Sequence, residues 1–213
     1  MTEKEKLEKY MLYGTDGKIP LKKCIEGELL LILMSLPLII SIFIGVTDNM
    51  LGMLGILPTI IYPVFILKAK KGKAIEGFLC ILHHGIWGVC FCFLLGLSGI
   101  EIVLCLFQGK ERVIILCIAG AGYILSALSW LCMMRIAIKK MDSSKTKKVN
   151  GSIPFAIFGV LGITAAKVLL KDMDEEKGMK LLCVICFFLS YLTVCGIFLI
   201  VKFLYLVKHV MKK

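Results

Sequence analysis

Charged residues are scarce in this sequence. They make up 19% of its 213 residues, while 59% of the residues are hydrophobic; soluble domains have about 25% and about 45–50%, respectively. A water-soluble fold of this size has too little interior to bury that surplus of apolar side chains. The composition therefore excludes an ordinary soluble domain and predicts that lipid surrounds most of the chain.

Several signatures of catalysis and nucleic-acid binding are also absent. The sequence has no glycine–lysine nucleotide loop, no pair of catalytic acids and no His-x-x-x-His set, so nothing in it predicts phosphoryl or acyl transfer. Its net charge of +11 comes from lysine blocks between long apolar runs, and membrane topology and anionic lipids explain that placement. We expect the lipid bilayer as a partner, and no nucleic acid, cofactor or metal.

Cysteines are frequent but are missing from the polar segments, with one exception. Nine of the ten lie in or beside apolar runs, and only Cys24 lies in a polar segment. Disulfide frameworks belong to small secreted domains with cysteines in their loops. We therefore expect packing thiols and no structural disulfide.

Six uncharged runs are each long enough to cross a bilayer. About twenty helical residues at about 1.5 Å each match a hydrocarbon core of about 30 Å. We predict an all-α fold, a polytopic membrane helical bundle of about six transmembrane helices. The predicted spans are Leu29 to Thr47, Asn49 to Leu67, Gly77 to Ile100, Val113 to Met134, Asn150 to Ala166 and Leu181 to Val201.

Lysine and arginine are unevenly distributed between the segments that join these runs. Alternate segments hold 20 on one side and 6 on the other, and the positive-inside rule assigns the richer side to the cytoplasm. We predict a multi-pass protein of the cytoplasmic membrane with both termini cytoplasmic. Its parts are a cytoplasmic segment 1–28 with an amphipathic surface helix, a six-span domain 29–207 and a basic tail 208–213.

Two features interrupt this regular pattern. Pro58 and Pro63 break the second span, so freed backbone carbonyls can face a cavity. Ile102 to Phe107 is apolar but too short to span. It either prolongs the third helix or lies in the membrane interface.

The third predicted span carries polar and small residues four positions apart, which places them on one helical face. One interpretation is a packing seam, because small side chains let a neighbouring helix approach closely. The other is that Glu76, Cys80 and His84 line a polar cavity, because ionisable groups within a membrane are commonly functional. The stripe consists of Glu76, Cys80, His84, Gly88, Cys92 and Gly96.

A second face of the same span carries His83 and Cys90, which can act as a base and a thiolate nucleophile. A cytoplasmic helix, two spans and a basic loop precede this pair, and a fourth span, a second basic loop and two more spans follow it. This layout resembles the accessory-gene-regulator B membrane peptidases of bacterial quorum sensing, which trim and cyclise a signal peptide. The resemblance implies that His83 is the base and Cys90 the nucleophile. That family has a glycine-rich stretch with an arginine before the histidine, whereas this chain has Ala74-Ile75-Glu76-Gly77-Phe78-Leu79.

Three functions stay open from the sequence. The first is a permease, or a small-molecule-binding membrane subunit of a transporter, with Glu76, Cys80 and His84 at its site. The second is a helix-bundle partner or regulator without a site of its own, and the third is a membrane cysteine peptidase using His83 and Cys90. The candidate partners are a small-molecule ligand and a membrane protein, either another chain or a second copy of this one.

Overall fold

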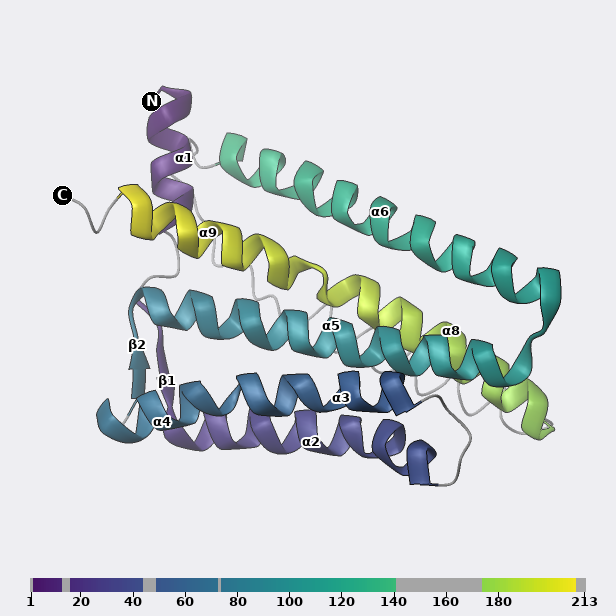
Figure 1. The fold of residues 1–213 in the computed structure, drawn as a ribbon. Helices are drawn as coiled ribbons and strands as arrows, with labels where there is room; N and C mark the ends of the chain where they lie inside the picture. Colours follow the sequence, from purple (N-terminus) through teal and green to yellow (C-terminus); the bar gives the residue numbers. More distant parts are fainter. Residues whose placement is uncertain (1, 13–15, 44–48, 73, 141–173, 210–213) are drawn as a thin grey trace.

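The computed structural model describes residues 2–12, 16–43, 49–72, 74–140 and 174–209 (Figure 1). Most of these residues are helical, which confirms the predicted helical bundle. The helices are α1 (Glu3–Leu12), α2 (Leu21–Phe43), α3 (Asn49–Ile61), α4 (Pro63–Gly72), α5 (Phe78–Leu106), α6 (Gly109–Lys140), α8 (Glu175–Thr193) and α9 (Cys195–His209).

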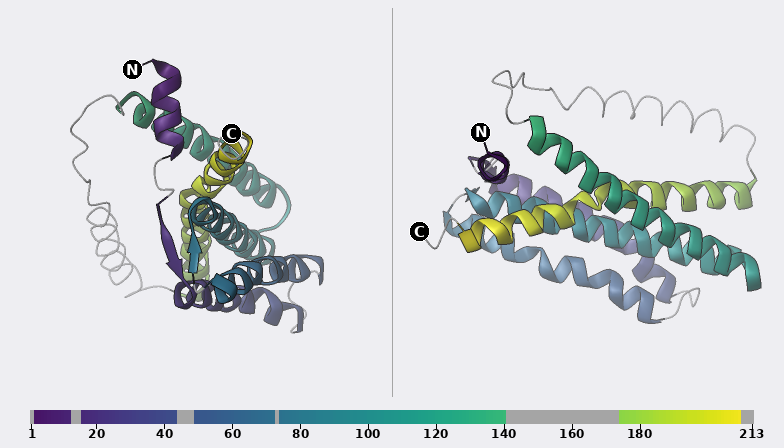
Figure 2. Two further views of the ribbon diagram at one scale, coloured as in Figure 1. Left: turned by 90° about the vertical axis from the view of Figure 1, so that its left-hand side faces the viewer. Right: turned by 90° about the horizontal axis from the view of Figure 1, so that it is seen from above.

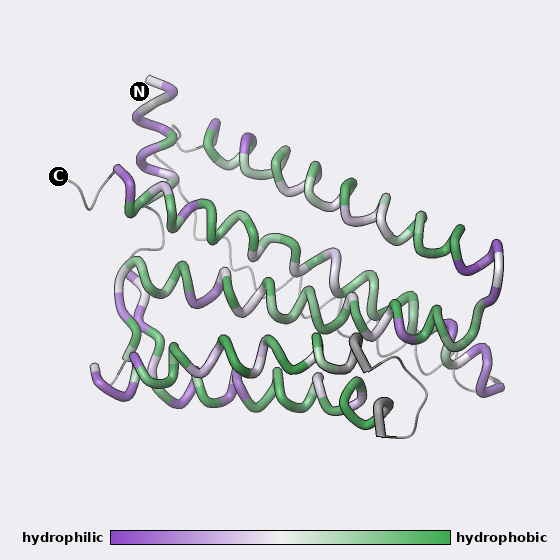
Figure 3. Tube along the Cα trace, in the orientation of Figure 1, coloured by the Kyte–Doolittle hydropathy of each residue, from purple (hydrophilic) through white to green (hydrophobic). Residues whose placement is uncertain are grey.

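Four helical stretches within the described ranges are long and apolar enough to cross a membrane. Large apolar side chains point outward from the bundle: Leu33 is 63% exposed and Ile118 is 65% exposed. Figure 3 shows hydrophobic residues along most of each long helix. Such a surface is unfavourable in water and suits lipid, so the fold is that of a membrane-embedded helical bundle. The four stretches are Met53–Gly72, Phe78–Leu106, Gly109–Lys139 and Glu175–His209.

Parts of the predicted spans lie outside the described residues. These are the fifth span, Asn150 to Ala166, and the turn around Asp48 between the first two spans. The third helix is longer than predicted, because α5 continues to Leu106. The segment from Ile102 therefore prolongs that helix, as one of the two expectations had it.

The lysine-rich segments gather at one end of the bundle. Figure 1 shows α1, both strands, the end of α4 and the C-terminal ends of α6 and α9 at this end, which we call the strand end. The connection from α5 to α6 and the start of α8 lie at the opposite end. The described segments are thus sorted between the two ends in the way that the sequence predicts.

Two short strands depart from the all-α prediction. β1 (Lys18–Pro20) pairs antiparallel with β2 (Ala74–Glu76). Gly77 follows with a positive φ of 63°, a conformation that favours glycine, and α5 begins directly after it. Glu76 therefore lies in a strand and not on the helical stripe. The spacing of four residues predicts one uninterrupted helix, so it does not indicate that Glu76 lies in a strand before α5 begins.

α5 is the central helix of the bundle. It packs against α8 and α9 on one side and against α2 and α3 on the other, and both views in Figure 2 agree with this arrangement. Its backbone closely approaches Gly196 of α9: a Cβ atom there would lie 2.8 Å from the Gly85 carbonyl oxygen and 2.9 Å from the Gly88 carbonyl carbon. Small residues of α5 thus form a packing seam with α9.

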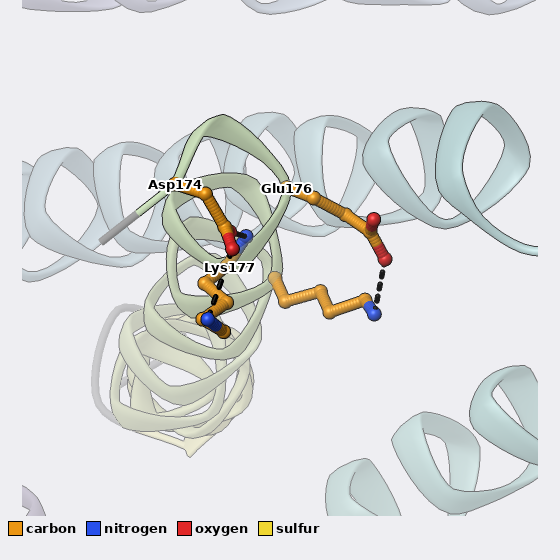
Figure 4. A network of polar contacts seen from close by, with 4 residues as sticks. Asp174, Glu176 and Lys177 are labelled. Atoms are coloured by element: carbon orange, nitrogen blue, oxygen red, sulfur yellow. Dashed lines mark hydrogen bonds and ion pairs between the residues drawn. The ribbon is translucent and has the colours of Figure 1, made fainter. Parts of the chain in front are cut away.

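The end of the bundle opposite the strand end, which we call the far end, carries charged side chains at the start of α8 (Figure 4). Asp174 is the N-cap of α8 and accepts a hydrogen bond from the Lys177 N–H at 2.9 Å. Its carboxylate also pairs with the Lys177 ammonium at 2.9 Å. The hydrogen bonds from the Lys177 side chain and backbone hold the pKa of Asp174 below its ordinary value. A second pair joins Lys180 to Glu176 at 2.5 Å.

α1 packs on the bundle through apolar side chains. Met11 is buried in a cluster with Leu206 of α9 and Ile81 of α5. The Tyr10 ring lies under the Lys202 ammonium, 4.9 Å from nitrogen to centroid. α1 therefore covers the strand end of α9.

Candidate functional site

Tyr62 lies at the break between α3 and α4. α4 begins at Pro63, whose nitrogen carries no hydrogen for helical bonding. The Tyr62 N–H still donates to the Pro58 carbonyl oxygen at 3.1 Å. At this break the Tyr62 side chain is fully buried, with 0% exposed. The two prolines that interrupt the second span therefore flank a buried tyrosine.

Tyr62 is hydrogen-bonded to His83 of α5. Tyr62 Oη and His83 Nε2 are 2.5 Å apart, and the two ring centroids are separated by 5.3 Å. Phe65 of α4 lies edge-on to the same imidazole, also with a centroid distance of 5.3 Å. The imidazole of His83 is thus buried and bordered by two aromatic rings.

Gly27 of α2 lets two polar side-chain atoms approach that helix closely. A Cβ atom on Gly27 would lie 2.5 Å from Tyr62 Oη and 3.3 Å from Trp87 Nε1. Since glycine has no Cβ, the hydroxyl and the indole nitrogen can both lie against α2. Three helices of different sequence regions therefore meet at Tyr62.

Glu28 brings a carboxyl group to the same place. Its side chain is buried, and it interacts electrostatically with Tyr62 and Cys90. Two buried atoms here, Glu28 Oε2 and His83 Nδ1, have no hydrogen-bond partner. Among the described residues, Glu28 also forms no ion pair with lysine or arginine. We call Glu28, Tyr62, Phe65, His83 and Trp87 the acid–histidine cluster.

The cluster lies inside the strand end of the bundle. Glu28 is seven residues after the start of α2 and His83 is five residues after the start of α5. At about 1.5 Å per residue, both side chains are about 8–10 Å along their helices.

Cys90 is buried in the same hydrophobic core as Tyr62. It follows His83 by seven residues on one continuous helix, which separates the two backbone positions by about 10 Å. An imidazole and a thiol at that spacing do not meet, because a base and its nucleophile need about 2.6–3.2 Å. The structure thus brings His83 to Tyr62 rather than to Cys90.

The other predicted site residues are not brought together. Glu76 is exposed and pairs with Lys18 across the two strands at 2.6 Å. Cys80 is buried, and its thiol donates to the Gly17 and Ile75 carbonyl oxygens at 3.0 and 3.1 Å. His84 is exposed, and its ring lies edge-on to the His83 ring with a centroid distance of 5.3 Å.

A second cluster of polar side chains lies where α5, α6 and α8 meet, nearer the far end of the bundle. Ser190 Oγ donates to the Cys92 carbonyl oxygen at 2.7 Å and lies 2.6 Å from Tyr123 Oη. Ser126 donates to the Tyr191 carbonyl oxygen at 2.7 Å. These hydroxyl groups bond across helix boundaries and join three helices. We call Cys92, Tyr123, Ser126, Ser190 and Tyr191 the Ser190 network.

The described residues offer little support for a disulfide, a metal site or a further polar pocket. All ten cysteines lie in the described ranges and are free thiols. No group of three or more His, Cys, Asp or Glu side chains within those ranges is arranged to hold a metal ion. An open pocket of about 310 Å³ lies beside α9, and its described lining, which includes Met133, Phe198 and Leu199, has no charged side chain.

Sequence reasoning missed Glu28 and Tyr62. Glu28 was assigned to the segment before the first span, and Tyr62 was one apolar-run residue among many. The available signals were the acidic residue next to the apolar run and the prolines at 58 and 63.

Comparison with known proteins adds no identity to this geometry. No family model, no curated protein and no solved structure matches the chain. The layout shared with the accessory-gene-regulator B peptidases is thus not accompanied by a family match. The class that the fold supports is a membrane-embedded helical protein.

Proposed function

We propose that this chain is a small permease, or the membrane subunit of one, that binds a small molecule or ion at the acid–histidine cluster. One observation carries the proposal: Glu28 Oε2 and His83 Nδ1 are both buried without a partner. Buried polar atoms are normally hydrogen-bonded, and each unmet one lowers stability. A ligand that bonds to them removes this penalty, which favours a binding role over a purely structural one.

The location of the cluster supports transport in particular. Ionisable residues inside membrane proteins mark substrate and ion pathways and proton relays. Here the acid comes from α2, the imidazole from α5 and the phenol from Tyr62 at the break between α3 and α4. Broken helices next to a binding site are common in transporters.

The proposed setting is the cytoplasmic membrane, with both termini and the strand end on the cytoplasmic side. The support is the excess of Lys and Arg in the segments that gather at this end. In this orientation the cluster is one to two helical turns from the cytoplasm.

The test is co-purification and reconstitution. The parent protein, Glu28→Gln and Glu26→Gln would be purified in mild detergent, analysed by mass spectrometry for bound small molecules, and assayed in liposomes for uptake of what is found and for proton flux. Glu26 is the matched control, because it is on the same helix but exposed and paired with Lys22 at 3.9 Å. We expect the parent and Glu26→Gln to bind and transport, and Glu28→Gln to do neither. Equal behaviour of all three proteins would refute the site.

A membrane cysteine peptidase using His83 and Cys90 is the second candidate. The observation that favours it is that Cys90 is buried in the same core as Tyr62, the hydrogen-bond partner of His83. This function requires α5 to open between the two residues, because they are two helical turns apart. Cys90→Ser separates the candidates: it abolishes cleavage of a peptide substrate by a peptidase and leaves binding by the permease unchanged.

A further inference from the structure

The charge of the acid–histidine cluster restricts its ligand. Glu28 contributes a carboxyl group, and no described lysine or arginine is paired with it. A lone buried carboxylate is costly and is normally compensated by a proton or a cation. An anionic ligand would add a second negative charge, so the cluster selects against anions.

The surroundings of the carboxyl group restrict the kind of cation. Aromatic rings lie around the neighbouring His83 imidazole: Tyr62 and Phe65 have centroids 5.7 Å apart, and each is 5.3 Å from His83. Aromatic faces attract organic ammonium groups. Calcium needs about six to eight oxygen ligands, whereas this cluster offers only the Glu28 carboxyl group and the Tyr62 hydroxyl. A small organic cation therefore fits the chemistry better than a metal ion.

The two unpartnered atoms add a requirement for hydrogen-bond donors. Glu28 Oε2 is an acceptor when the carboxyl group is ionised. His83 Nδ1 is also an acceptor in the tautomer whose Nε2–H donates to the Tyr62 oxygen. We propose, on the basis of the proposed function, that the ligand is a protonated primary amine with an apolar substituent. Its ammonium donates to Glu28 and His83, and its substituent packs among the rings of Tyr62, Phe65 and Trp87.

The chain offers a fluorescent reporter for this proposal. It has two tryptophans: Trp87 in the cluster and Trp130 on α6. Trp130→Phe leaves Trp87 as the single reporter beside the site. The probes are benzylammonium, benzyl alcohol as a neutral analogue of the same shape, and tetramethylammonium, which is charged but has no N–H donor.

Titration of Trp130→Phe in detergent at neutral pH should give a saturable change in Trp87 emission with benzylammonium. Benzyl alcohol and tetramethylammonium should each bind about tenfold or more weakly, because each lacks the charge or the donors. Adding Glu28→Gln should weaken benzylammonium binding by a similar factor, and adding Glu26→Gln should leave it unchanged. Size-exclusion profiles check that each variant folds.

Two outcomes would overturn the inference: benzyl alcohol or tetramethylammonium binding as tightly as benzylammonium, or benzylammonium binding that survives Glu28→Gln. The first comparison uses an unaltered site and stands even if Glu28→Gln fails to fold. Glu28-dependent proton flux in liposomes without any amine binding would overturn the amine ligand and leave the proposed function intact. If neither flux nor binding depends on Glu28, both proposals fail.

Discussion

The bundle contains two clusters of polar side chains, and they differ in whether their buried polar atoms have hydrogen-bond partners. In the Ser190 network, the hydroxyl groups of Tyr123, Ser190 and Ser126 each have a partner on another helix. In the acid–histidine cluster, Glu28 and His83 each keep one buried atom without a partner. The comparison teaches that burial of polar groups alone does not identify a site in a membrane bundle. A candidate site is identified by buried polar atoms that have no hydrogen-bond partner within the protein.

The chemical groups explain this difference. Serine and tyrosine hydroxyls are neutral and bond readily across helices, so they hold a membrane bundle together. A carboxyl group without a counter-ion opposes folding. Proteins retain such destabilising groups where function requires them. The Ser190 network is therefore a structural connection, and the acid–histidine cluster is the candidate site.

The largest expected effect comes from the helix crossing that holds both regions in place. A Cβ atom on Gly196 would lie 2.8 Å from the Val89 backbone nitrogen and from the Gly85 carbonyl oxygen. Gly196→Ala should therefore lower the free energy of unfolding by about 3 kcal/mol. Gly120→Ala is the control, because nothing lies within 4 Å of its Cβ position. Thermal unfolding in detergent measures the stability of both variants. Equal melting temperatures would contradict the close packing of α5 against α9 at Gly196.

The next effect has the opposite sign. Glu28→Met replaces the unpartnered carboxyl group with an apolar side chain of similar length, and should raise the free energy of unfolding by about 2 kcal/mol. The same change at the exposed Glu26 should have little effect. A lower melting temperature for Glu28→Met would mean that Glu28 is stabilised by its surroundings, and the contrast between the two regions would break down.

Removing a hydrogen bond from the Ser190 network should lower the free energy of unfolding. Ser190→Ala removes the hydroxyl group between Tyr123 and Cys92 and should lower the free energy of unfolding by about 1 kcal/mol. Combining it with Tyr123→Phe in a double-mutant cycle isolates the bond between the two hydroxyl groups. A coupling energy of zero would show that this bond does not contribute to stability.

The smallest effect is expected at Asp174, which caps α8 and lies outside both regions. Because its pKa is lowered on folding, its contribution is complete above the ordinary value of about 3.8 and is lost as pH falls through the folded pKa. Asp174→Asn keeps the cap and should remove this pH dependence; Asp174→Ala should lose the cap at every pH. Melting temperatures from about pH 6 to about pH 3 check this, and an unchanged pH profile in Asp174→Asn would contradict it.

The sequence predicted the helices much better than it predicted the site. Long apolar runs require helices in lipid, because every backbone polar group must be bonded within its segment. This constraint is local, so it can be recognised residue by residue. It does not predict β1 and β2, since Ile19 and Ile75 pair across more than fifty residues of chain.

The site could not be predicted because its parts come from three helices. Spacing along α5 assigns His83 and His84 to different faces of the helix, but it could not indicate that His83 bonds to Tyr62 while His84 is exposed. Glu28 and Cys80 illustrate the same limit. The glutamate next to an apolar run is buried at the cluster, and the cysteine of the stripe bonds to backbone carbonyl oxygens.

The contact between α1 and α9 has a consequence for biosynthesis. The ribosome makes α1 well before α9, yet Met11 shares a buried cluster with Leu206, and Tyr10 lies against Lys202. The apolar side of α1 therefore has no docking partner on α9 until α9 has been made. A chain shortened before α9 never acquires this cover.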